Sequence, residues 1–240
     1  MTSRPRRNAG APTRAGIAYS KLREDILGGR FTPGQQLRFA EMVDLYQCSI
    51  GALREALHLL ASTGLVESEA QLGFRVVSVS ADDLVDLTTA RSEIEVLALK
   101  YAIRDGDVNW EAKAVAAHHL LERAPQFSDA EKGIFTEEWA VAHAAFHQAL
   151  LNGCSNRRIL STALSLRDSA ELYRRWSVPL GHDLGRNIAG EHRAILDATI
   201  RRDRDEAGKL LASHIQHTTK SLLTVLQNES SSKEKVATPS

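Results

Sequence analysis

The spacing of apolar residues changes once along the chain, near Val79. Before this point the apolar groups are short and are interrupted by glycine or proline. After it, apolar residues recur three or four positions apart over long stretches, the spacing of one face of an α-helix. A chain of 240 residues is long enough to form two cores. The change therefore predicts two domains, a small mixed one at 17–79 and an all-α one at 80–227.

The front segment predicts three helices and a small hairpin. The helices are expected at 17–27, 39–45 and 50–62, and the strands at 65–67 and 74–79. Ser49 is expected to cap the third helix, which ends at Gly64. Gly28 and Gly29 end the first helix, because glycine accepts the backbone angles of helix C-termini. This order of elements forms a winged helix-turn-helix unit.

The rear segment predicts an all-α bundle of about six helices. Ser80 and Asp83 resemble a capping box that opens the first of them, and Gly106 lies at its end. Further helices are expected at 108–124, 132–152, 156–177, 185–201 and 204–227. The two ends of the chain are polar and lack large apolar residues, so 1–16 is expected to be a flexible basic arm and 228–240 a disordered tail.

Composition excludes several classes of protein. Apolar runs such as 59–61 fall far short of the ~20 residues that span a bilayer, so we expect no membrane segment and a cytoplasmic protein. Cys48 and Cys154 lack the close spacing of a metal knuckle, and two cysteines form no disulfide framework.

The net charge is zero, yet residues 1–78 hold ten Lys or Arg against seven Asp or Glu. This imbalance fits a nucleic-acid-binding front, although a solvated surface also produces it.

The front segment also carries a specific set of residues in register. They are Pro33-Gly34, Leu37, Ser49, Arg54-Glu55-Ala56-Leu57, Leu60, Gly64-Leu65-Val66 and Gly73. In this order the segment resembles the DNA-binding domain of GntR-superfamily transcription regulators. The resemblance implies that the helix after Ser49 enters the major groove, where donors near its N-terminus reach bases and phosphates.

Eight residues are expected to contact DNA: Arg38, Ser49, Ile50, Gly51, Arg54, Gln71, Gly73 and Arg75. Ser49 and Arg54 supply donors on the recognition helix, whereas Arg38 and the wing residues Gln71 and Arg75 meet phosphates or the minor groove. An ion pair of Arg54 with Glu55 or Glu41 is the alternative.

The chain departs from the family pattern at four positions. Ile50 stands where the family usually has an arginine, and an isoleucine cannot form the bidentate contact with guanine. Gly51, Gln47 and Phe39 stand where threonine, glycine and glutamate are common. These departures predict an unusual operator or a lower affinity.

Four of the nine histidines have informative spacing in the rear segment. His143 and His147 lie four residues apart and therefore on one face of a predicted helix. His192 and His214 lie on the last two predicted helices, which could bring them to the first pair. Imidazole suits Zn²⁺ and Ni²⁺. The alternative is that these histidines are ordinary core or surface residues.

Residues 82–220 resemble the FCD effector domain of the FadR branch of GntR regulators. The motifs are Arg91-Ser92-Glu93-Ile94-Glu95, Phe146-His147 with Gly153 and Asn156, and Glu191-His192-Arg193-Ala194-Ile195 with Asp203, Ala207 and His214. The resemblance implies a divalent metal held by an aspartate and three histidines. His147, His192 and His214 match, and His143 occupies the aspartate position. Four neutral ligands disfavour hard ions, so Zn or Ni is expected.

The resemblance also implies an effector cavity beside the metal. Arg91 is expected to bind a carboxylate with its planar guanidinium, and Asn156 and Arg174 are expected to line the same cavity. The alternative for Arg91 is a pair with Glu95 on its own helix.

Together these features predict a DNA-binding transcription regulator, a repressor, whose operator binding responds to a small carboxylate. A homodimer on double-stranded operator DNA follows from the family, as does a bacterial-type cytoplasmic location on the nucleoid. One alternative is a metal-responsive repressor. The other, a metal-dependent helical-bundle enzyme, is disfavoured because the chain has no HExxH motif and an enzyme is not expected.

Overall fold

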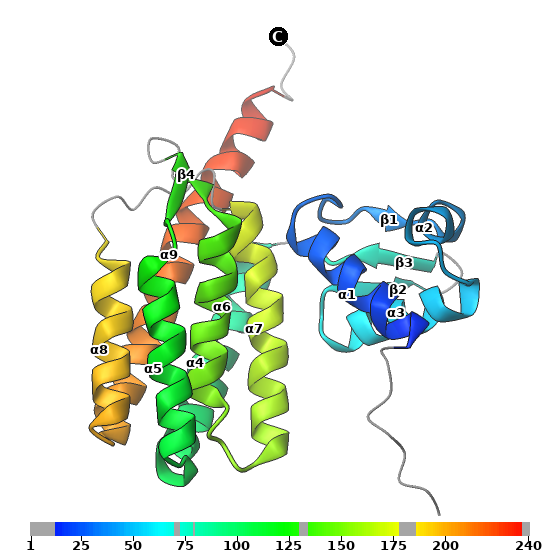
Figure 1. The fold of residues 1–240 in the computed structure, drawn as a ribbon. Coiled ribbons are helices and arrows are strands. Elements are labelled where there is room, and N and C mark those ends of the chain that lie inside the picture. Colours follow the sequence, from blue (N-terminus) through cyan, green and yellow to red (C-terminus); the bar gives the residue numbers. More distant parts are fainter. Residues whose placement is uncertain (1–12, 70–72, 79, 130–133, 178–185, 237–240) are drawn as a thin grey trace, which may run out of the picture. The chain divides into compact units, whose positions relative to one another are not determined.

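The computed structural model describes residues 13–69, 73–78, 80–129, 134–177 and 186–236. The chain divides into two compact units, Met1–Ser78 and Val79–Ser240. The first is a winged helix-turn-helix and the second is helical, as the sequence predicts (Figure 1).

The first unit places three helices against a small sheet. Its elements are α1 (Arg14–Leu27), β1 (Gln36–Leu37), α2 (Phe39–Tyr46), α3 (Ile50–Ser62), β2 (Val66–Glu69) and β3 (Gly73–Val76). The sheet is antiparallel in the order β1-β3-β2, with Leu37 opposite Phe74. The predicted hairpin therefore gains a third strand, because Leu37 is buried and the backbone before α2 pairs with β3.

Helix capping sets the bounds of these helices. The Ser49 side chain accepts a 3.2 Å hydrogen bond from the Ala52 amide, as expected of an N-cap. Thr13 caps α1 in the same way, so this helix begins at Arg14. The flexible arm predicted for 1–16 was wrong for residues 14–16, since Ala15 is buried and starts the apolar face of α1.

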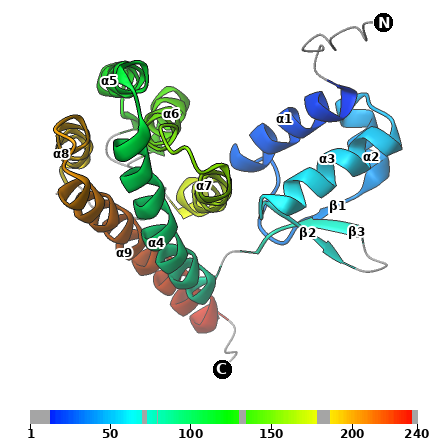
Figure 2. The ribbon, with the colours of Figure 1, turned by 90° about the horizontal axis from the view of Figure 1, so that it is seen from below.

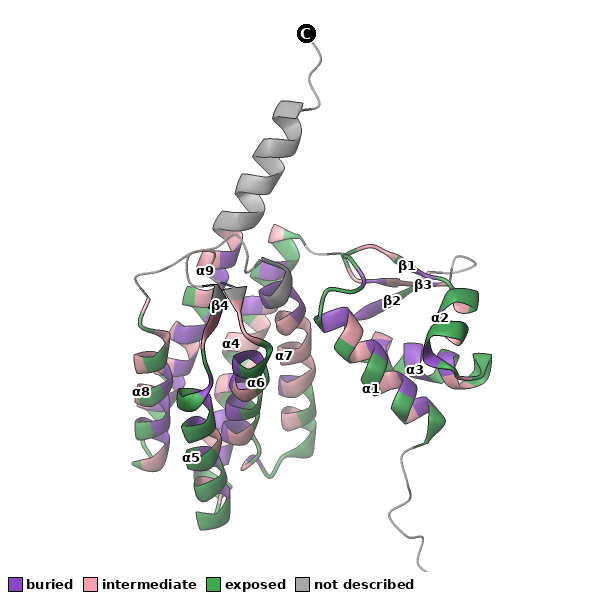
Figure 3. Cartoon of the chain, turned by 45° about the horizontal axis from the view of Figure 1, so that its top comes forward, coloured by how far each residue is buried: buried purple, intermediate pink, exposed green. Residues whose placement is uncertain are grey.

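The described part of the second unit contains six helices. They are α4 (Ala81–Asp105), α5 (Val108–Arg123), α6 (Glu137–Leu151), α7 (Arg157–Ser177), α8 (Ile188–Ile200) and α9 (Arg204–Val236). Seen along the bundle, α4 packs between α7 and α9, and α8 lies beside α9 (Figure 2). The buried faces of the helices turn inward (Figure 3), and the core is mainly apolar, with Leu99, Phe146 and Ile195 fully buried.

Two bounds in this unit differ clearly from the prediction. The strand β5 (Ile134–Phe135), which pairs with β4 (Phe127–Asp129), lies near the start of the helix expected at 132–152. Thr136 caps the helix instead, and Phe135 stacks on Trp139 with ring centroids 4.3 Å apart. The tail expected to be disordered from 228 is helical as far as Val236, since neither glycine nor proline interrupts residues 228–236.

Candidate metal centre and nucleic-acid interface

Four buried histidines meet in the core of the helical unit. His143 and His147 come from successive turns of α6, His192 from α8 and His214 from α9. One ring nitrogen from each can be chosen so that all four lie within 4.8 Å of one another. The Nε2 atoms of His147 and His192 are 3.3 Å apart. These are distances at which a single ion could accept a nitrogen from each ring.

The surroundings keep the four imidazoles neutral. Burial lowers the pKa of His143, His147 and His192 well below the ordinary value, and the neighbouring histidines and arginines lower it further. Burial also lowers the pKa of His214, although the Glu191 carboxylate opposes this shift. A neutral imidazole has a lone pair free for a metal, so the cluster is in the protonation state that a metal needs.

Glu191 orients one of the rings. Its Oε2 lies 2.7 Å from His214 Nδ1, and Arg186 binds the same carboxylate through two hydrogen bonds. Because a carboxylate accepts and does not donate, this short contact favours the tautomer in which His214 Nδ1 carries the proton and Nε2 keeps its lone pair, although Arg186 Nη2 also lies 3.2 Å from Nδ1. A carboxylate behind an imidazole is the usual arrangement around metal-binding histidines.

One of the four histidines, His143, has a ring nitrogen that lacks a hydrogen-bond partner in the part of the chain that the structure describes. Its Nδ1 is buried and has no hydrogen-bond partner among the described residues. Such a group costs about 1–3 kcal/mol when it is left unsatisfied. Four neutral, clustered imidazoles, one of them with an orphaned nitrogen, fit a divalent ion of intermediate softness.

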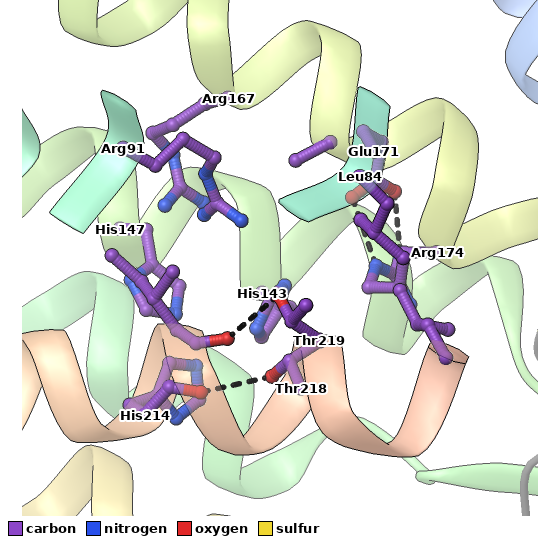
Figure 4. A pocket seen from close by; sticks show the side chains of 13 residues that line it. Leu84, Arg91, His143, His147, Arg167, Glu171, Arg174, His214, Thr218 and Thr219 are labelled. Carbon is purple, nitrogen blue, oxygen red and sulfur yellow. Dashed lines mark hydrogen bonds and ion pairs between the residues drawn. The ribbon is translucent and has the colours of Figure 1, made fainter. Parts of the chain in front are cut away.

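A small pocket opens from this cluster toward α4 and α7. Its wall includes His143, His147 and His214 and three arginines, which are Arg91, Arg167 and Arg174 (Figure 4). The cavity volume is about 30 Å³. The guanidinium groups of Arg91 and Arg167 lie side by side above His147 (Figure 4).

One buried carboxylate holds two of these arginines. Glu95 is fully buried and accepts hydrogen bonds from Arg91 Nε at 2.6 Å and from Arg167 Nη1 at 2.8 Å. Burial raises the pKa of Glu95, but the two guanidinium groups outweigh this effect and hold it below the ordinary value. The ion pair of Arg91 with Glu95, which the sequence left as an alternative, does form, and Arg91 lines the pocket as well.

Arg174 reaches the pocket as predicted, and Asn156 does not. Arg174 binds Glu171 and lies over the Phe135 and Trp139 rings, with 5.6 Å from its Cζ to the Trp139 centroid. Asn156 is exposed, and its Oδ1 accepts from the amides of Arg158 and Ile159. It caps α7 about 16 Å along the helix from Arg167, and it does not line this pocket as predicted.

A second pocket includes His192 in its wall. It has a volume of about 120 Å³, and its wall includes His118, Trp139 and Ile188. His118 is buried, which lowers its pKa, and its ring meets Phe146 edge-on at 5.1 Å. His192 thus belongs both to the histidine cluster and to the wall of a second pocket.

In the first unit, α3 presents the predicted DNA contacts on one solvent face. Ile50, Gly51 and Arg54 are exposed there, whereas Leu53 and Leu57 are fully buried on the opposite face. The Arg54 guanidinium lies 5.6 Å above the Phe39 ring. Phe39, a departure from the family pattern, therefore supports the arginine that the family shares.

The other predicted contacts lie around this helix. Arg38 precedes α2, and its guanidinium pairs with the Glu41 carboxylate at 3.4 Å. Glu41 is one of the two residues that the sequence offered as an alternative partner of Arg54. Arg75 on β3 pairs with Glu69 at 2.8 Å across the hairpin. Gly73 has a φ of +92°, which favours glycine, so its role includes shaping the turn. Gln71 lies outside the described residues.

Comparison with known proteins gives the family. The model of the gntR family of bacterial regulatory proteins matches residues 15–76, and that of the FCD domain matches residues 86–217. The chain belongs to the GntR family and carries an FCD domain. It is a DNA-binding transcription regulator, and the families and relatives that match are regulators rather than enzymes.

Two relatives cover most of this regulator. An uncharacterized HTH-type transcriptional regulator, BphR of Paraburkholderia xenovorans, is 34% identical over 82% of this chain and 80% of its own length. The HTH-type transcriptional repressor GlaR of Escherichia coli is 33% identical over 82% of this chain and 90% of its own length.

Solved structures support the same fold. McbR/YncC of Escherichia coli superposes with a TM-score of 0.72 at 19% identity and covers 88% of this chain and 98% of its own. A GntR regulator from Rhodococcus sp. RHA1 gives 0.67 at 22% identity, with the same coverage of both chains. Among the described residues, none of the regulator's helices is apolar over a length that could cross a bilayer.

Sequence reasoning missed two residues of the helical site. Arg167 carries no motif and is one of 30 Lys and Arg residues, so only its contact with Glu95 identifies it. Glu191 does have a signal in the sequence, because it directly precedes His192 in the matched motif. Its position behind His214, however, depends on the packing of α8 on α9.

Proposed function

We propose that this regulator is a ligand-responsive repressor that binds its operator as a homodimer. Its FCD domain would hold one divalent ion and a small organic acid side by side. The observation that carries the proposal is a cluster of four neutral imidazoles, three of which line one pocket together with three arginines. The name of the relative GlaR, a repressor, supports the direction of regulation.

The metal would be held by His143, His147, His192 and His214. Imidazole nitrogens favour Zn²⁺ or Ni²⁺ over ions that prefer oxygen, and the aspartate that would favour harder ions is absent here. When bound, the ion supplies a positive centre to which a carboxylate oxygen can bind. Glu191 fixes the His214 ring for this purpose.

The charges of the pocket favour an anionic effector. Three guanidinium groups line it, and two carboxylates, Glu95 and Glu171, offset them. A divalent ion would add two positive charges. A carboxylate on the effector could bridge the ion and Arg91 or Arg167, because a guanidinium matches a carboxylate with two parallel hydrogen bonds.

The size of the pocket supports a switch. A volume of about 30 Å³ holds one or two waters. A larger acid therefore requires side chains of the wall to move, Arg174 and Glu171 among them. An effector that binds one arrangement of the pocket better than the other shifts the balance between them.

Helix α7 connects the pocket to the start of α4. Tyr173, next to Arg174, accepts a hydrogen bond from the Ser80 amide at 3.2 Å and donates one to Asp83 Oδ2 at 2.5 Å. Ser80 caps α4 and lies two residues after Ser78, the last residue of the DNA-binding unit. A shift of α7 would therefore act where the two units join.

The DNA-binding unit would place α3 in the major groove. Ser49, Gly51 and Arg54 would meet bases and phosphates there, with Arg38, Gly73, Gln71 and Arg75 around them. A homodimer would set two such helices ~34 Å apart on successive grooves. Exposed apolar side chains on α5 and α6, Val108, Val115, Leu120 and Val141, provide surface for such an interface. A cytoplasmic protein that joins the nucleoid through its operator fits this activity.

Metal content tests the proposal first. Untagged protein is measured by elemental mass spectrometry beside His147→Ala and a control, His119→Ala, which removes an exposed histidine of α5. We expect about one zinc or nickel per chain in the wild type and the control, and none in His147→Ala. Absence of metal from all three would contradict the metal half of the proposal.

Operator binding tests the effector half. Fluorescence anisotropy of a labelled operator is followed while a panel of small carboxylates is added to the metal-loaded protein. We expect one chemical group of acids to weaken binding. The second candidate, a metal-responsive repressor, rests on the replacement of the family's aspartate by His143 and predicts that operator affinity follows added ion without any acid.

A further inference from the structure

The solvent face of α3 begins with an apolar side chain. Ile50 is the first residue of the helix and is 56% exposed, whereas the next residues along the same face, Arg54 and His58, are polar. Leu53 and Leu57 on the opposite face are fully buried and hold the helix to its unit. Ile50 thus lies where a groove-binding helix meets base edges, and it contributes little to the core.

Gly51 leaves space beside this isoleucine. A Cβ at Gly51 would have only Ser49 Oγ within 4 Å, at 4.0 Å, and the backbone there does not adopt a positive φ. Neither crowding nor backbone strain therefore requires glycine at this position. Glycine is also a poor helix former, which costs up to about 1 kcal/mol relative to alanine in a helix interior, so helix formation does not favour it here. The missing side chain lets another molecule approach Ile50 closely.

The polar groups around Ile50 are partly engaged. The Ser49 hydroxyl oxygen accepts from the Ala52 amide, and the Arg54 guanidinium lies one turn further along, over Phe39. The first turn of α3 thus presents the apolar side chain of Ile50, and the guanidinium of Arg54 follows one turn later.

We propose that Ile50 reads the C5 methyl group of a thymine in the operator. Thymine is the base whose edge in the major groove carries a methyl group, and an apolar side chain distinguishes it by contact. This inference rests on the proposed placement of α3 in the major groove. It assigns thymine, rather than guanine, to the base that faces the first residue of α3.

Removal of the methyl group alone tests the inference. Duplexes are first selected from a random pool with the purified full-length protein. Each thymine of the selected sequence is then replaced in turn by deoxyuridine, which keeps every hydrogen-bonding group and lacks the methyl. We expect one position in each half-site at which wild-type affinity falls about fourfold, the effect of one methyl group removed from an apolar contact.

Two variants make the result specific to Ile50. Ile50→Ala should bind the thymine and deoxyuridine duplexes equally well, and its exposed position should leave folding intact. Val85→Ala, which shortens an apolar side chain that is 46% exposed in the other unit, should keep the fourfold difference. Selection with Ile50→Arg should replace the thymine by guanine.

Failure of this inference can be distinguished from failure of the proposed DNA binding. If wild type binds every deoxyuridine duplex as tightly as the original, or if Ile50→Ala keeps the difference, the inference is overturned while DNA binding stands. A pool in which no sequence is enriched overturns both the proposed sequence-specific binding and the inference.

Discussion

Glu95 on α4 accepts a 2.8 Å hydrogen bond from Arg167 on α7, 72 residues further along the chain. The same carboxylate binds Arg91, four residues away on its own helix. Because Glu95 is fully buried, both bonds form where water competes little. One carboxylate thus joins two helices and holds two guanidinium groups at the wall of the pocket.

Replacement of Glu95 by glutamine should be strongly destabilising. Glu95→Gln leaves two arginines, each about nine-tenths buried, without a counter-charge. Loss of one partner of a buried pair costs about 3–5 kcal/mol, which urea unfolding followed by circular dichroism would measure. Asp205→Asn, which breaks the exposed pair with Lys100, is the control and should change the unfolding free energy far less.

The effect of Glu95→Gln should depend on pH. The folded-state pKa of Glu95 lies below its ordinary value, so the unfolded chain takes up a proton first as the pH falls. The stability that the carboxylate contributes is therefore complete above about pH 4.5 and is lost as the pH falls through the folded-state pKa. Since a protonated glutamate resembles glutamine, the gap in unfolding free energy between wild type and Glu95→Gln should narrow below pH 4.5. A gap that widens toward acid would refute the assignment.

Trp139 should report on the metal. Its ring stacks on His143 with centroids 4.8 Å apart and an interplanar angle of 18°. Ni²⁺ added to chelator-treated protein should quench the indole fluorescence and saturate at one equivalent, because a paramagnetic ion at His143 lies close to the ring. Trp139→Phe should lose most of this response while still binding the ion, and His143→Ala should lose both.

Arg54 should be essential for operator recognition. Arg54→Ala removes the cation on the exposed face of α3, and we expect affinity for the selected operator to fall at least tenfold by fluorescence anisotropy. Arg201→Ala removes one exposed positive charge from the helical unit and should change affinity little. An unchanged footprint of Arg54→Ala on the operator would contradict the assignment.

Tyr173 should couple the pocket to operator binding. Tyr173→Phe removes the hydroxyl that bonds Ser80 and Asp83 without touching the pocket's arginines. We expect acid and metal binding to stay near wild type, while the acid changes operator affinity by a smaller factor. Isothermal titration calorimetry measures the binding and anisotropy measures the coupling. Equal coupling in wild type and variant would exclude this route.

Local signals in the sequence predict much of this structure. Ser49 and Ser80 cap α3 and α4 where their spacing places them, because an N-cap depends on residues within one turn. The pairing of His143 with His147 follows from helix periodicity alone. The resemblance to a known family, rather than periodicity, predicts that His192 and His214 join them.

A contact between distant segments accounts for one feature that the sequence did not predict, and local contacts account for two others. Arg167 enters the pocket wall because α7 packs on α4, and no nearby residue marks that contact. The Asn156 side chain accepts hydrogen bonds from backbone amides at the start of α7 instead of facing the cavity. An asparagine suits either role. The strand β5 occupies part of the first turn of the helix that was expected to begin at residue 132. The Phe135 ring of β5 stabilises this arrangement by stacking on Trp139.

The four histidines lie on three helices, and 45 residues separate His147 from His192. An ion held by all of them would close two large loops of the chain, much as a disulfide does, and would reduce the conformational freedom of the unfolded chain. The two cysteines are free, so the ion would be a cross-link that needs no oxidant. Metal-loaded protein should then resist unfolding and proteolysis longer than the apo form, and the cell's supply of the ion would set how long the regulator lasts.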